Sequence, residues 1–174
     1  MRLFFSLLPP STAASRLAEF IAHCELPRGS RLIDQVNLHL TLAFVGEAEA
    51  GEVHAIGRLS SVVDPGEVSV RLDRCVYWRN SSVIVATTHG RTRGLHEMSS
   101  SLQSAVSLYR SAARDELKWR PHVTLARNVS QPPVLQAMSP VEWIASSFAL
   151  MSSERRDGRS VYTVVDTYPL LDKI

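Results

Sequence analysis

One short pattern occurs twice in this chain and constrains its fold more than any other feature. It reads His, aliphatic, Thr, Leu, Ala, and it occupies residues 39–43 and 122–126. With six His and eight Thr in the chain, chance places a Thr two residues after a His only roughly 0.3 times. A single His–Thr pair is typical of an ordinary half-buried strand. Two copies with the same flanking residues indicate a shared role in two similar halves.

Each copy of the pattern places two polar side chains on one face of a predicted strand. Side chains alternate between faces, so His39 and Thr41 point the same way, as do His122 and Thr124. If the two halves pack about a pseudo-twofold axis, both pairs converge on one cleft. An imidazole titrates near about pH 6.5, so one His can act as a base while the other acts as an acid. With Thr hydroxyls donating to an anion, such a site suits in-line displacement at phosphorus.

The rest of the sequence predicts an α+β chain. Apolar residues spaced by three and four predict helices over 13–21, 47–63 and 92–109, the first after a Ser11-Thr12 N-cap. Apolar runs and alternation predict strands at residues 1–8, 38–45, 68–78, 83–86, 122–126, 141–151 and 161–168. Strands and helices alternate irregularly in this order, which favours a largely antiparallel sheet.

Composition excludes several classes of protein. A chain of 174 residues with 45% hydrophobic content is expected to form one domain, residues 1–174, built as two lobes. A net charge of +2 excludes the strongly basic footprint of a protein that wraps duplex nucleic acid. The two cysteines, Cys24 and Cys75, exclude a disulfide framework and a thiolate zinc site. No run approaches the roughly 18 apolar residues of a membrane span, so we expect a soluble, cytoplasmic protein. We also expect it to be a monomer.

The sequence resembles the two-histidine phosphoesterase superfamily, whose signature is a His-x-Thr-x (HxTx) motif with one copy in each half. The likeness is to its RNA 2′,3′-cyclic phosphodiesterase branch, which is 2′-5′ RNA ligase-like. It rests on the opening strand with Pro9 and Pro10 and on residues 37–46 and 120–127 around the two motifs. It extends to tail residues, which are Leu150, Ser152, Ser153, Gly158, Tyr162 and 168–170.

The resemblance implies a bilobal α+β fold, in which two small antiparallel sheets face a central cleft and the helices lie outside. It also implies hydrolysis of a 2′,3′-cyclic phosphate, at the end of an RNA or a nucleotide, to a 2′-phosphate without metal or cofactor. His39 is then the proton donor to the departing 3′ oxygen, and His122 is the proton acceptor from water. Thr41, Thr124 and Arg127 are then the phosphate-binding residues.

The position of Arg127 raises a geometric condition. It follows His122 by five residues, so strict alternation places it on the opposite face of the strand. The strand must therefore end or bulge before Arg127 if this side chain is to contact phosphate. Two segments depart from the family pattern: Gln35-Val36-Asn37 lacks an acidic residue, and 111–118 lacks a Gly-containing turn.

The other aromatic, imidazole and basic groups have weaker signals. Phe44 and Trp119 adjoin the motifs and are candidates for stacking a base, whereas Trp78 and Trp143 are expected in the core or at its rim. The Arg-rich turn at 154–159 is interpreted as a solvated turn, with contact to RNA phosphates as the alternative. The remaining histidines are expected to be surface or packing residues: His23, His54, His89 and His96.

Three alternative functions share parts of the same pattern. A related enzyme would act on another cyclic nucleotide, such as an ADP-ribose cyclic phosphate, or would catalyse the reverse 2′-5′ ligation of tRNA halves. A non-catalytic RNA-binding module would keep the cleft without turnover. The intact second motif argues against the module, because binding alone needs no paired acid and base.

Overall fold

The computed structural model describes residues 1–63, 66–90, 92–110, 119–156 and 159–170. Within them lie three α-helices, which are α1 (Ser11–Ala22), α2 (Val53–Gly57) and α3 (Arg93–Arg110). Short 3-10 helices are η1 (Gln35–Asn37), η2 (Ala50–Glu52), η3 (Arg58–Val62) and η4 (Arg79–Ser81). The strands are β1 (Arg2–Leu7), β2 (Arg31–Leu32), β3 (Leu40–Glu47), β4 (Val68–Leu72), β5 (Arg74–Trp78), β6 (Val83–Thr87), β7 (His122–Arg127), β8 (Val141–Ala145), β9 (Ser147–Arg156) and β10 (Arg159–Pro169).

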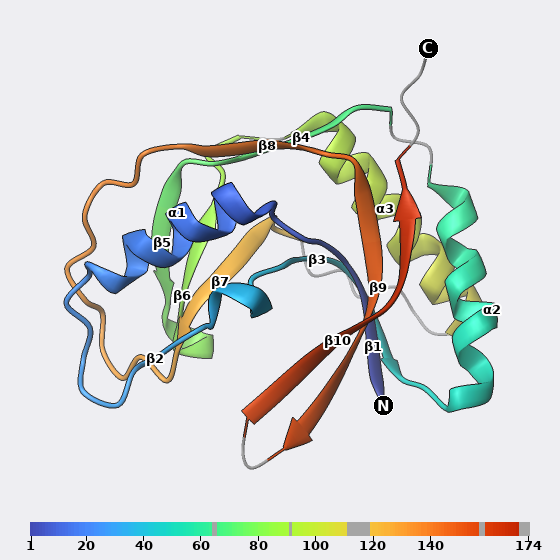
Figure 1. Cartoon of the computed structure of the whole chain (residues 1–174), viewed down its shortest axis with the longest axis horizontal. Coiled ribbons are helices and arrows are strands. Elements are labelled where there is room, and N and C mark those ends of the chain that lie inside the picture. The colour runs from blue at the N-terminus through green and yellow to red at the C-terminus, as the bar shows by residue number, and fades with distance from the viewer. Residues whose placement is uncertain (64–65, 91, 111–118, 157–158, 171–174) are drawn as a thin grey trace.

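The strands form one large and one small sheet, and every strand pair in the described residues is antiparallel. The large sheet has eight strands in the order β10-β9-β1-β3-β7-β6-β5, with β2 also paired to β7. Its two halves meet where β3 pairs with β7 through Leu40 and Val123. The expected two sheets of the lobes are therefore joined at the motif strands into one continuous sheet (Figure 1).

Three predicted elements divide where the sequence pattern is continuous. The helix expected over 47–63 begins at residue 50 and runs to residue 62 as three successive pieces, η2, α2 and η3. Gly57 packs closely on β10, since a Cβ at this position would lie 2.8 Å from the Tyr168 hydroxyl. The strand expected over 141–151 breaks at residue 146, where the chain passes from β8 in the small sheet to β9 in the large one. The strand expected over 68–78 likewise divides into β4 and β5.

The hydrophobic core lies on one face of the large sheet. Helix α1 contacts β7 and β8, and α3 contacts β3 and β4, so helices and the small sheet cover the same face (Figure 1). Leu40 and Val123 are fully buried in this core with Leu17 of α1 and Leu102 of α3. Their neighbours along β3 and β7 must therefore point to the opposite face. None of the described helices combines the length and hydropathy needed to cross a membrane.

Candidate active site

The two HxTx motifs lie next to each other at the junction of the two halves. Because β3 and β7 are antiparallel and Leu40 pairs with Val123, residues 39 and 41 stand opposite residues 124 and 122. Since Leu40 and Val123 face the core, the two His–Thr pairs share the other face. The register of β3 with β7 thus brings the four side chains together, as the sequence predicted. We call this side of the sheet the catalytic face.

Both histidines are held by the same local hydrogen bond. Nδ1 of His39 lies 2.7 Å from the Asn37 carbonyl oxygen, and Nδ1 of His122 lies 2.7 Å from the Arg120 carbonyl oxygen. A carbonyl oxygen only accepts, so each Nδ1 carries the proton and donates it. In the neutral ring Nε2 is then the unprotonated nitrogen, free to accept a proton, and in the charged ring it is the donor. One tautomer therefore equips either residue for either half of acid–base catalysis.

Aromatic side chains pack against each imidazole from its own half of the sheet. The His39 ring centroid lies 5.1 Å from that of Phe4 and 4.8 Å from that of Tyr162. The His122 ring lies 4.5 Å from Trp78. Sequence reasoning missed Phe4 and Tyr162, and it placed Trp78 only in the core or at the rim. Nothing in their local pattern distinguishes them, because the contacts join strands far apart in the chain.

A β-bulge directs Arg127 towards the histidines. Ile84 of β6 pairs with Ala126, whereas the next residue, Val85, pairs with Thr124, so Leu125 is an extra residue in β7. This bulge shifts the alternation by one, which returns Arg127 to the catalytic face. The sequence required β7 to end or bulge before Arg127 if this side chain is to contact phosphate, and the observed register contains such a bulge. Its positive charge reaches both imidazoles, as their electrostatics show.

Burial and charge lower the pKa of both catalytic-face histidines. For His39 the largest cause is burial, and the charges of Arg127 and His122 lower the pKa further. For His122 burial again acts first, followed by the Arg127 charge. The carbonyl oxygens that accept from Nδ1 oppose these effects by favouring the protonated ring. Both rings are therefore held towards the neutral state at pH 7.

Phe44 and Trp119, the two predicted stacking residues, have different surroundings. Phe44 leaves 75% of its surface exposed and lies beside Phe4, with 6.3 Å between ring centroids. Trp119 packs against the core, and its indole Nε1 donates to the Thr41 carbonyl oxygen over 3.1 Å. His96 meets the Trp119 ring edge-on at 5.2 Å. Phe44 thus offers an exposed ring beside Phe4, which itself packs on His39, while Trp119 supports the strand that carries Thr41.

The other sequence features lie away from the motifs or outside the described residues. His23 Nδ1 bonds to the Glu19 carbonyl oxygen, and His89 lies 3.3 Å from the Asp73 carboxylate, in line with surface and packing roles. Arg155 is exposed near the end of β9. Residues 111–118, whose loop was in question, lie outside the described residues. Among the described residues no group of three or more potential metal-ligating side chains is found.

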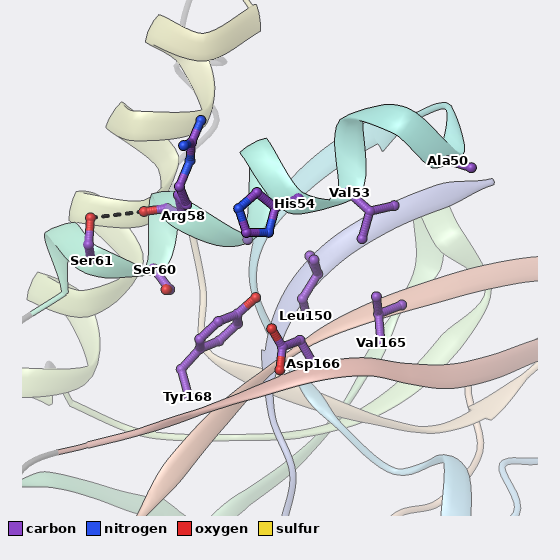
Figure 2. A pocket seen from close by; sticks show the side chains of 11 residues that line it. Ala50, Val53, His54, Arg58, Ser60, Ser61, Leu150, Val165, Asp166 and Tyr168 are labelled. Carbon is purple, nitrogen blue, oxygen red and sulfur yellow. Dashed lines mark hydrogen bonds between the residues drawn. The ribbon is translucent and has the colours of Figure 1, made fainter.

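A pocket lies on the other side of β10 and is separate from the motifs. It has a volume of about 630 Å³ and is lined from η2, α2, η3, β9 and β10. Figure 2 shows Asp166 and Tyr168 of β10 on one side and His54 of α2 on the other. A bulge at Val165, where the β9–β10 register shifts, turns Asp166 away from the face that carries Tyr162. No residue predicted from the motifs lines this pocket.

Comparison with known proteins decides the family. A family model described as the 2′-5′ RNA ligase superfamily matches residues 9–157, which include both motifs and Arg127. The chain belongs to this superfamily. Within it, the RNA 2′,3′-cyclic phosphodiesterase of Escherichia coli strain K12 is 28% identical over 172 residues, covering 97% of this chain and 96% of the relative. The protein of that name from Thermus thermophilus is 30% identical over 184 residues, covering 98% of this chain and 90% of the relative.

Two solved structures share the fold of this chain. The crystal structure of Escherichia coli LigT complexed with ATP superimposes with a TM-score of 0.85 at 28% identity, covering 97% of each chain. A crystal structure described as that of a phosphoesterase has a TM-score of 0.89 at 26% identity, again covering 97% of each. These neighbours and the antiparallel pairing confirm the α+β fold predicted from the sequence.

Proposed function

We propose that this protein is an RNA 2′,3′-cyclic phosphodiesterase, acting on the cyclic end of an RNA or nucleotide and releasing a 2′-phosphate. The observation that carries the proposal is the pair of imidazoles with matched Nδ1–carbonyl hydrogen bonds on one face. Two relatives with that named activity align over nearly the whole chain. Binding alone would need neither the second histidine nor the shared tautomer.

The proposed reaction is an in-line attack of water on phosphorus. His122 Nε2 accepts a proton from water as the water oxygen forms its bond to phosphorus. The bond from phosphorus to the 3′ oxygen breaks, and His39 Nε2–H protonates that oxygen. One proton enters His122 and one leaves His39, so the pair returns to its starting state when the two exchange a proton with solvent. The phosphate remains on the 2′ oxygen.

The remaining groups are proposed to bind the phosphate. The hydroxyls of Thr41 and Thr124 donate to non-bridging oxygens, and Arg127 adds a charge-assisted bond. The anion also has an electrostatic effect, because its negative charge raises the pKa of nearby imidazoles. It thereby opposes the lowering caused by burial and Arg127, and it favours the protonated state that His39 needs as a donor. Phe44 is proposed to stack on the terminal base.

The closing test is a product assay with a nucleoside 2′,3′-cyclic phosphate in the presence of EDTA. Hydrolysis to the 2′-phosphate is expected, and His39→Ala or His122→Ala should each lower turnover by about 10²–10⁴-fold. A 3′-phosphate product would contradict the donor and acceptor roles. Loss of activity with EDTA and recovery with a divalent ion would contradict the metal-independent mechanism. Near-normal turnover in either variant would remove that histidine from the mechanism.

A further inference from the structure

Two arginines face each other at the end of the catalytic face. Strand β2 pairs with the last residues of β7, and Arg31 is the cross-strand partner of Arg127. Antiparallel partners lie on the same face with Cα atoms about 4.5–5.5 Å apart. Because the bulge at Leu125 places Arg127 on the catalytic face, Arg31 is on that face too.

The pairing brings together two like charges that no described acidic group neutralises. Neither Arg31 nor Arg127 forms a salt bridge with a carboxylate in the described ranges. Like charges directly opposite each other in a sheet are unfavourable. The Arg31 side chain is exposed, so it can reach a ligand without displacing packed residues. An anion bound between or beside the two guanidinium groups would relieve their repulsion.

Arg127 lies nearer to the two histidines than Arg31 does. The Arg127 charge lowers the pKa of both His39 and His122, whereas Arg31 is not among the groups that shift either. Along β7 the order is His122, Thr124, Arg127, with Arg31 opposite the last. In the proposed function the cyclic phosphate binds among the histidines, threonines and Arg127, and Arg31 extends the cationic surface outward from that site.

We propose that Arg31 forms a second phosphate subsite, which binds the phosphodiester on the 5′ side of the terminal nucleotide. This deepens the proposed function, on which it rests, by making the end of an RNA strand a better substrate than a mononucleotide. A guanidinium suits this role because its planar donors match two phosphate oxygens. This subsite does not discriminate between RNA base sequences, since it contacts only the sugar–phosphate backbone.

The test compares two substrates that differ by one additional nucleoside and the phosphodiester that links it. One is a nucleoside 2′,3′-cyclic phosphate, and the other is a dinucleotide with the same cyclic end. For Arg31→Gln the dinucleotide should show a KM raised about tenfold, the value of one charge-assisted hydrogen bond, whereas the mononucleotide should be unchanged. The slope of log kcat/KM against log salt for the dinucleotide should become shallower by about 0.7, the value for one phosphate contact on a single strand. Arg28→Gln, an exposed arginine three residues earlier outside β2, is the matched control and should change neither substrate.

Each other result has a definite meaning. Equal losses on both substrates would overturn the second subsite and place Arg31 on the cyclic phosphate itself. No change on the dinucleotide, or the same change in Arg28→Gln, would also overturn it while the proposed function stands. If the unmodified protein hydrolyses neither substrate, the proposed function fails and this inference fails with it.

Discussion

The indole nitrogen of Trp119 donates a hydrogen bond to the backbone carbonyl oxygen of Thr41, across 78 residues of sequence. Thr41 is the hydroxyl-bearing residue of the first motif, and Trp119 lies just before the second. The bond therefore ties the entry to β7 to the strand that carries half of the site. Trp119 is not a free stacking platform like Phe44, because one edge of its ring is committed to this bond and the ring packs on the core.

Replacing Trp119 by Phe keeps an aromatic ring but removes the donor to Thr41. We expect the free energy of unfolding to fall by about 1 kcal/mol, the usual net value of one hydrogen bond, and kcat/KM to fall because the Thr41 strand is less well fixed. Urea unfolding and steady-state kinetics measure the two effects. Trp143→Phe is the control, since the buried Trp143 indole nitrogen has no hydrogen-bond partner among the described residues. Equal destabilisation in both variants would show that ring size, and not the hydrogen bond, is responsible.

Local sequence was sufficient to predict the parts of the site that follow from strand periodicity. His39, Thr41, His122 and Thr124 share a face because alternation requires it once residues 40 and 123 are buried. The same rule shows that Arg127 can share the face of His122 only if β7 ends or bulges before it, and a bulge is present at Leu125. Repetition of a short motif was informative because it implied that two distant strands share one role.

Features that depend on pairing between distant strands were not predictable in this way. Trp78 reaches His122 from β5, and Tyr162 reaches His39 from β10, yet neither adjoins a motif in sequence. The division of 141–151 at residue 146 also escaped prediction, because its apolar residues continue while the chain changes sheets. The Arg31–Arg127 pair is likewise visible only in the register of β2 with β7.

The pH dependence of kcat/KM should be a bell with its maximum below pH 6.5. This profile reports the acid and base of the free enzyme, and burial and the Arg127 charge lower the pKa of both His39 and His122 from 6.5. The reaction needs one protonated and one neutral ring, so the maximum lies between the two apparent pKa values of the pair. Rates measured from about pH 4.5 to 8.5 with a cyclic nucleotide, a range that brackets the ordinary imidazole pKa, test this. A maximum above about pH 7 would contradict the lowered pKa values.

Arg127→Gln should move that maximum to higher pH while lowering its height. Removal of the positive charge raises the pKa of both imidazoles, since their protonated states no longer face a like charge. The height falls because the phosphate loses a charge-assisted contact. Arg127→Lys is the matched control: it keeps the charge, so the maximum should stay in place even though the planar donor fork is lost. A shift of equal size in both variants would show that the movement is not electrostatic.

Trp78→Ala should raise the pKa of His122 directly and should move that of His39 less, because the indole contacts only the His122 ring. The indole lies 4.5 Å from the His122 ring, and burial is the largest cause of that ring's lowered pKa, so opening one side to water favours the charged form. The basic groups on this half of the face, Arg127, Arg31 and Arg74, are unaltered. NMR titration of the two imidazoles measures both values without requiring turnover. Tyr77→Ala is the control, because Tyr77 points to the opposite face, where its hydroxyl donates to the Val129 carbonyl oxygen. If both variants move the His122 pKa equally, the shift comes from loosening β5 and not from the loss of the ring contact.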